Sequence, residues 1–212
     1  MLNLLWKLVE DESDAESRAL AEMLKVHPEL PDWSAAVRPL LDRLLQSNDI
    51  KRSFVCRVLS GMPFNALALS HKTIVIAESL VDFCRGQTHQ MAFVVAHEIS
   101  HLYRRHARER SDISTVAGMV LTTNPIVGFG LKALLDRGCS RENEFEADRD
   151  AATFCHRAGY SALAGADFLQ RLASGELPKN MIQQLLSTHP PLSERMAELR
   201  VWTDKLRAAA TA

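Results

Sequence analysis

Two histidines and a glutamate stand close together in the apolar segment AFVVAHEISHLYRRHAR, residues 92–108. His97 and His101 are four positions apart, so on an α-helix their rings project from one face, about 5–6 Å apart at Cβ. Glu98 follows His97 directly and emerges beside that face. Neutral imidazole is a good zinc ligand. The spacing therefore predicts a metal site on a helix, with Glu98 placed to reach a water molecule without binding the metal.

This arrangement is the HExxH pattern of zinc peptidases, although a pattern with three fixed positions is not proof alone. The alternative is a pair of hydrogen-bonded histidines on an ordinary amphipathic helix. A catalytic zinc site also needs a third protein ligand and an open fourth position. The metal interpretation therefore requires a further carboxylate or imidazole elsewhere in the chain.

The segment SRENEFEAD, residues 140–148, offers that ligand. Glu144 and Asp148 are four apart and share a helix face. Glu144 completes a His₂Glu set, and Asp148 is placed to accept the free ring N–H of a ligating histidine, which would fix the ring. Glu142 and Glu146 point elsewhere and are expected to be solvated. Taken alone, Glu144 and Asp148 would be an ordinary acidic helix face. Because a HExxH helix lies upstream, we interpret them as part of a metal site.

Helices and a small sheet must position these groups. Helical periodicity covers residues 11–47, broken at Pro31-Asp32-Trp33 with Asp32 as the expected N-cap, and resumes from 87 to about 110. Further helices are expected from about 140 to 159, and over 161–173, 178–187 and 191–208. Alternation near 54–59 and short apolar runs at 64–69 and 73–77 predict the strands of one small sheet of about three or four strands.

Bulk composition excludes several classes of function. The net charge is −1, and no basic stripe interleaved with aromatics points to nucleic acid. The four cysteines form no CxxC pair, which argues against a disulfide framework or a cysteine zinc site and favours buried free thiols.

The first residues lack the features of a signal peptide. Residues 116–135 are apolar but interrupted by Thr-Thr-Asn-Pro and by Lys132, so two short helices, or a hairpin on a membrane surface, are expected instead of a span.

With these motifs in order, the chain resembles the gluzincin family of the HtpX heat-shock peptidases, the CAAX prenyl endopeptidases and related quality-control peptidases. Its pattern is HExxH followed by SRxxExxAD, and HEISH and SRENEFEAD fill both parts. Asn65, Ala66, Leu67 and Ala68 resemble the family's edge-strand signature, with leucine in place of the usual aromatic. The segment 188–191, THPP, together with Arg195, resembles its closing segment. The resemblance covers about residues 35–200.

The resemblance implies an α+β, mainly helical fold: a zincin-like core with a small mixed sheet packed on the HExxH helix. It implies one zinc ion per chain, bound by His97, His101 and Glu144, with Glu98 as general base. In the family's position, His189 would stabilise the oxyanion or cap the zinc. The alternative is a purely structural role, in which His189 caps the helix that begins at Pro-Pro. His106 also matches a family histidine and is expected to be structural.

The strand from Asn65 to Ala68 suggests how substrate binds. An exposed edge strand can hold an extended polypeptide through backbone hydrogen bonds with little sequence preference. The alternative is a strand that only completes the sheet.

The sequence thus predicts a zinc metalloendopeptidase that acts on unfolded or exposed protein segments. Residues 1–50 are expected to form a helical region packed on a metallopeptidase domain of residues 51–212. The expected location is the cytoplasm, with membrane contact through 116–135 as an added option; the sequence does not predict the oligomeric state. The alternatives are a non-catalytic scaffold or adaptor with a capped zinc site, and a metal-free helical interaction protein.

Overall fold

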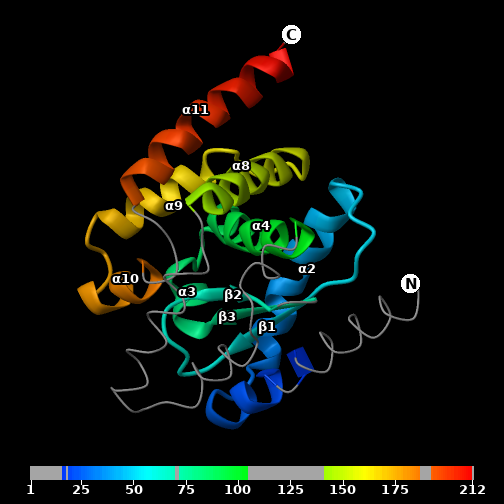
Figure 1. Cartoon of the computed structure of the whole chain (residues 1–212), viewed down its shortest axis with the longest axis vertical. Helices are drawn as coiled ribbons and strands as arrows, with labels where there is room; N and C mark the ends of the chain where they lie inside the picture. Colours follow the sequence, from blue (N-terminus) through cyan, green and yellow to red (C-terminus); the bar gives the residue numbers. More distant parts are fainter. Residues whose placement is uncertain (1–15, 18, 70–71, 105–140, 187–191, 212) are drawn as a thin grey trace.

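The computed structural model describes residues 16–17, 19–69, 72–104, 141–186 and 192–211. Residues 19–26 are helical. The labelled elements of Figure 1 follow in the order α2 (Pro31–Ser47), β1 (Val55–Leu59), β2 (Ala66–Ala68), β3 (Thr73–Ala77), α3 (Glu78–Phe83), α4 (Thr88–Arg104), α8 (Arg141–Arg157), α9 (Ala164–Ala173), α10 (Lys179–Leu186) and α11 (Leu192–Thr211).

The three strands form one mixed sheet in the order β1-β3-β2. β1 runs parallel to β3, with Val55 opposite Thr73, and β2 runs antiparallel to β3, with Ala66 opposite Ile76. All five side chains of β3 are buried, as expected for a central strand covered on both faces. Glu29 bridges to Leu59 on the outer side of β1. In the described part of the chain, β2 is therefore the edge with no strand beyond it.

Helix α4 lies at the centre of the molecule. Every residue from Gln90 to Leu102 is buried, which is the pattern of a core helix rather than of a helix with one apolar stripe. It packs against α8, α9, α2 and the sheet, and Figure 1 shows it between the strands and α8. Because α4 is enclosed in this way, its polar side chains must find polar partners inside the protein.

The α+β, mainly helical architecture is as expected, and so is the mixed sheet that packs on α4. The expected N-cap at Asp32 is wrong. Helix α2 begins one residue earlier, at Pro31, and Leu30 is the N-cap without a side-chain cap. Proline is favoured at the first helical position because its ring presets φ and its missing N–H is not needed there. Asp32 instead lies in the first turn, where its negative charge suits the helix dipole.

Some expectations fall outside the described residues or are not tested by the fold. The expectations outside the described residues concern the apolar segment 116–135, His106, His189 and Cys139. The division at residues 50 and 51 stays a prediction; α2 itself packs against β1, α4 and α8. None of the helices in the described ranges is both long and apolar enough to cross a membrane.

Candidate metal centre

Helix α4 brings the two histidine rings together. His97 and His101 lie one turn apart, and their Nε2 atoms are 3.1 Å from each other. The rings meet edge to face at 79°, with centroids 4.7 Å apart. Both side chains are almost completely enclosed, since His97 is 4% and His101 0% exposed. Two ring nitrogens that face each other at this distance in the core form a site for a shared proton or a shared cation.

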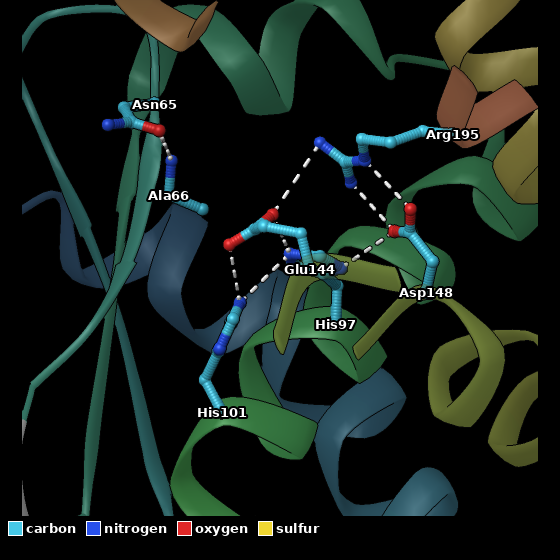
Figure 2. Close-up of polar contacts among 7 residues, drawn as sticks. All are labelled: Asn65, Ala66, His97, His101, Glu144, Asp148 and Arg195. Carbon is cyan, nitrogen blue, oxygen red and sulfur yellow. Dashed lines mark hydrogen bonds and ion pairs between the residues drawn. The ribbon is translucent and has the colours of Figure 1, made fainter. Parts of the chain in front are cut away.

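Helix α8 supplies the third group of the cluster. One carboxylate oxygen of Glu144 lies 3.4 Å from His97 Nε2, and the other lies 3.3 Å from His101 Nε2. Glu144 is fully buried. Figure 2 shows the three side chains converging from α4 and α8 on one point. These are the residues of the only His/Cys/Asp/Glu group in the described ranges whose donor atoms all lie close enough for one metal ion, within 4.8 Å of one another.

The spacing of the three donor atoms fits zinc. Ligand atoms about 2.0–2.1 Å from a tetrahedral ion are separated from each other by roughly 3.3 Å. The two Nε2 atoms are 3.1 Å apart, and each lies 3.3–3.4 Å from a different oxygen of the Glu144 carboxylate. With one oxygen as the ligand, the three donor atoms all lie within 4.8 Å of one another. Two imidazole nitrogens and one carboxylate oxygen also form the His₂Glu donor set of catalytic zinc sites. The residues present therefore fit a zinc ion in both chemistry and geometry.

Two further charged residues surround this cluster. Asp148, one turn after Glu144 on α8, places Oδ1 3.0 Å from His97 Nδ1. Arg195 reaches in from α11 and donates two hydrogen bonds to Asp148, each 2.7 Å long. Another guanidinium nitrogen lies 3.7 Å from the Glu144 carboxylate. Arg195 thus compensates the charge of both buried carboxylates, as Figure 2 shows.

This packing changes the proton affinities of the buried groups. Burial lowers the pKa of His97, but the hydrogen bonds and charges of Asp148 and Glu144 outweigh it and raise that pKa to about 9. Burial raises the pKa of Asp148, yet Arg195 and His97 hold it below its usual value. The Arg195 pKa is raised, because the two carboxylates outweigh its burial. The packing thus favours the charged forms of His97, Asp148 and Arg195.

Glu98 is arranged differently from the other buried acids. It is 3% exposed, yet its carboxylate makes no hydrogen bond or ion pair with any other described residue. It borders a small cavity together with His97 and Arg195. A carboxylate that stands next to the donor cluster, with no hydrogen bond to another residue of the described ranges, can accept a proton from a water molecule there.

A second set of contacts, which the sequence did not reveal, fastens α4 to α8 beside the cluster. The Ser100 hydroxyl donates to Asp150 at 2.7 Å. Arg104 donates two hydrogen bonds to Asp150 and one to Glu146. Glu146, expected to be solvated, is half exposed but paired. The signal that could have found this set is the i, i+4 repeat of Ser100 and Arg104 opposite that of Glu146 and Asp150.

The strand expected to bind substrate occupies the edge of the sheet. β2 comprises Ala66–Ala68, and Asn65 precedes it. The Asn65 carbonyl accepts from the Ala77 N–H, so the ladder with β3 begins at Asn65. Because alternate residues of an antiparallel strand face the partner, Ala66 and Ala68 direct their backbone groups away from β3. The Asn65 side chain covers the outward N–H of Ala66, accepting a 2.9 Å hydrogen bond (Figure 2).

Comparisons with known proteins match the chain to peptidases. The family model described as peptidase family M48 matches residues 31–203. The beta-barrel assembly-enhancing protease of Escherichia coli (strain K12) is 26% identical over 182 residues, covering 76% of this chain and 37% of that protein. The mitochondrial metalloendopeptidase OMA1 of Bos taurus is 25% identical over 191 residues, covering 77% and 36%.

A shorter relative is matched over more of its length. The protease HtpX homolog of Salinibacter ruber is 24% identical over 212 residues, covering 81% of this chain and 73% of that protein. The chain spans little more than a third of the first two relatives. Their full activities, substrates and partners are therefore not carried over with the match.

Proposed function

The chain belongs to peptidase family M48, and from this premise we propose that it is a zinc-dependent endopeptidase that cleaves unfolded or exposed polypeptide segments. The family and the names of the relatives support metallopeptidase activity. The observation that carries the proposal is the convergence of His97, His101 and Glu144 at 3.1–3.4 Å, with Glu98 beside them.

His97, His101 and Glu144 would hold the zinc ion. When bound, zinc supplies Lewis-acid chemistry: it polarises the scissile carbonyl and makes a water molecule acidic enough to be deprotonated near neutral pH. Asp148 would hold the His97 ring by accepting from Nδ1, and Arg195 would hold Asp148. The ring orientation would thus depend on three helices, α4, α8 and α11.

Glu98 would act as general base and then as general acid. It takes the proton from the attacking water and delivers it to the leaving amine nitrogen, so that the peptide bond breaks without a free amide anion. Its lack of a hydrogen-bond partner among the described residues supports this role, because no contact within those ranges competes with a water molecule for the carboxylate.

The substrate would lie as an added strand beside β2. The outward backbone groups of Ala66 and Ala68 would pair with the polypeptide. Ala66 also borders the cavity that contains Glu98, so a strand paired there would pass the proposed base. Replacing Ala66 with proline removes an outward N–H and leaves the ladder with β3 intact. Peptide hydrolysis should then fall more than zinc content; equal loss of both would count against a substrate role.

The second interpretation, a scaffold with a permanently capped zinc, depends on His189, which lies outside the described residues. The available carboxylate of Glu98 favours the enzyme, because a scaffold needs no general base. The decisive experiment measures zinc content and casein hydrolysis for wild type and Glu98→Gln. Both should bind about one zinc per chain, as one His₂Glu site requires, and only wild type should cleave. If both bind zinc and neither cleaves, the capped scaffold gains support, and His189→Ala becomes the next variant.

A further inference from the structure

We propose that Gly165 of α9 fixes the orientation of the His97 ring through the ring of Phe93, so that Gly165 and Phe93 are positioning residues of the candidate metal centre. The inference rests on the proposed zinc-dependent function and adds a structural reason why the first of the two histidines points at the other donors.

The His97 ring is held at one atom by Asp148 and along its side by Phe93. Its Nδ1 atom lies 3.0 Å from Asp148, but a single polar contact still allows the plane of the ring to tilt. Phe93 stands one turn earlier on α4, on the same face of the helix. The Phe93 and His97 ring centroids are 6.3 Å apart, and the two planes are tilted by 39°. This separation is typical of packed aromatic pairs, so Phe93 limits the tilt of the His97 ring.

Gly165 in turn limits where the Phe93 ring can lie. Helix α9 packs against α4, and a Cβ atom built on Gly165 would have three Phe93 ring atoms within 2.7 Å. Real Cβ atoms essentially never come closer than 3.0 Å to another atom. The Phe93 ring therefore occupies the space that a side chain at position 165 would need. Phe93 is 2% exposed, so its ring is also enclosed on its other sides.

The requirement for glycine at this position is steric rather than conformational. Other glycines of the described ranges, such as Gly159, have positive φ values, which favour glycine whatever its neighbours are. Gly165 does not have a positive φ and lies in the first turn of α9, where alanine would favour the helix more. A glycine that its own helix does not require indicates a requirement from a neighbour, and the Phe93 ring is that neighbour.

An added methyl group at position 165 should therefore disturb the metal centre. The Phe93 ring would have to leave its present place, and its contact with the His97 ring would change with it. Ligands of a metal site work only when their positions are held to within about 0.5 Å. Loss of a group that supports a ligand weakens metal binding about 10–100-fold. For Gly165→Ala we expect the lower end of this range, because Asp148 still holds the other side of the His97 ring.

The test measures zinc affinity, by competition with a chromophoric chelator, in a double-mutant cycle of Gly165→Ala and Phe93→Leu. In the wild-type background, Gly165→Ala should raise the Kd for zinc about tenfold. In the Phe93→Leu background it should change the Kd by less than about twofold, because leucine leaves room for the methyl group and the effects of residues in contact do not add. This rescue separates an effect through Phe93 from a general effect on α9.

A spectroscopic measurement shows whether the effect is on ligand geometry. The absorption spectrum of the cobalt-substituted protein depends on how the ligands are arranged around the ion, and it should change in Gly165→Ala and in Phe93→Leu. Phe64→Leu is the matched control. Phe64 is 1% exposed and packs on an aromatic ring, Phe83, with centroids 5.8 Å apart, rather than on a metal-ligand candidate. Phe64→Leu should keep the wild-type zinc affinity and cobalt spectrum.

Three results would overturn the inference. The first is an unchanged zinc affinity and cobalt spectrum in folded Gly165→Ala. The second is a loss of affinity in Gly165→Ala that persists in full in the Phe93→Leu background. The third is an equal effect of Phe64→Leu and Phe93→Leu on zinc affinity. If Gly165→Ala does not fold, this last comparison decides alone.

If wild type binds no zinc, the proposed function fails, and the positioning of the His97 ring is tested in the metal-free protein. The ring signals of His97 are then followed by NMR. They should move in Gly165→Ala and in Phe93→Leu and stay in place in Phe64→Leu. Signals that stay in place in all the variants, or that move equally in all of them, would refute the inference.

Discussion

Arg195 is the residue whose role depends most on the tertiary structure. It is 4% exposed and carries its charge into the core, where Asp148 and Glu144 receive it. Removing one partner from a buried ion pair leaves the other charge uncompensated, which costs far more than losing a surface pair.

Arg195→Met should therefore lower the free energy of unfolding of the metal-free protein by about 3–5 kcal/mol. Arg149→Met is the control, because Arg149 also joins α8 to α11, through Glu198, but both side chains are about two-fifths exposed. An exposed pair contributes only about 0–1 kcal/mol. Urea unfolding of both variants in the presence of a chelator measures the two losses in free energy of unfolding. Similar losses would show that the charge of Arg195 is not needed in the core.

The cysteines give a residue-scale prediction that depends on pH. Burial raises the pKa of Cys56 and Cys84 from 9.0 to about 12, and it also raises that of Cys155. At pH 8 a shift of three units leaves roughly 1,000-fold less thiolate, the form that reacts with iodoacetamide. In a Cys139→Ser background these thiols should stay unmodified in the folded protein and react rapidly in urea. Fast labelling without urea would contradict their burial.

At this scale His97, His101 and Glu144 lie together as the sequence predicts, and their role as metal ligands stays a prediction. Their environment was not predictable. His97, His101 and Glu144 follow from i, i+4 spacing and a known donor set, which are local properties. The free cysteines were also expected, and Cys56, Cys84 and Cys155 are buried and unpaired. The contacts of Arg195 depend on how α11 crosses α8, and no local spacing encodes such a crossing.

At the scale of elements, α4 and α8 carry the candidate metal centre between them. The contacts of Ser100 and Arg104 with Asp150 and Glu146 lie one turn from the donor atoms and tie the two helices together. They hold Glu144 opposite the histidines before any ion arrives. An ion that binds to helices already in place loses less free energy to ordering them.

Asp150→Ala should therefore weaken zinc binding about tenfold, at the lower end of the 10–100-fold range for residues that support metal ligands. Competition with a chromophoric chelator measures the affinity. Glu198→Ala breaks a different ion pair, between Arg149 of α8 and Glu198 of α11, and should leave zinc affinity unchanged. An unchanged affinity in Asp150→Ala would mean that the core packing of α4 alone positions the site.

The sequence located most elements because their periodicity is local. The run at 73–77 became β3, and the helical patterns became α2, α4 and α8 to α11. The short helix α3 was not expected, because its six residues continue an apolar run without a period of their own. Strand direction was also not predictable: β1 and β3 pair in parallel only because β2 intervenes in sequence and lies on the other side of β3.

At the scale of the whole molecule, the resemblance read from four motifs is confirmed by the family match over residues 31–203. The candidate centre lies inside the apolar core that the described residues form, in contact with helices from both halves of the chain. Binding at this position should therefore stabilise the whole fold rather than one loop.

Zinc should raise the thermal stability of wild type. A ligand at 100 times its Kd adds about 2.7 kcal/mol, which for a chain of this size is a rise in Tm of roughly 5–10 °C. Glu144→Gln should lose most of that zinc-dependent rise, whatever its own metal-free Tm. Thermal unfolding in chelator and in excess zinc measures both increments. Equal increments in the two proteins would place the metal elsewhere.

The outer edge of β2, beside which the described residues place no further strand, affects how this protein would associate with other polypeptide chains. Bare sheet edges join copies of a protein into β-aggregates. This edge is three residues long, and the Asn65 side chain already engages the N–H of Ala66. Two such edges that met would gain few hydrogen bonds, and each would first have to release its own asparagine. A polypeptide held close to the metal by further contacts can displace the asparagine, whereas a second copy of the folded protein lacks that anchor. In this way the Asn65 side chain would keep the protein from aggregating through its sheet edge, even among the unfolded segments that it is proposed to cleave.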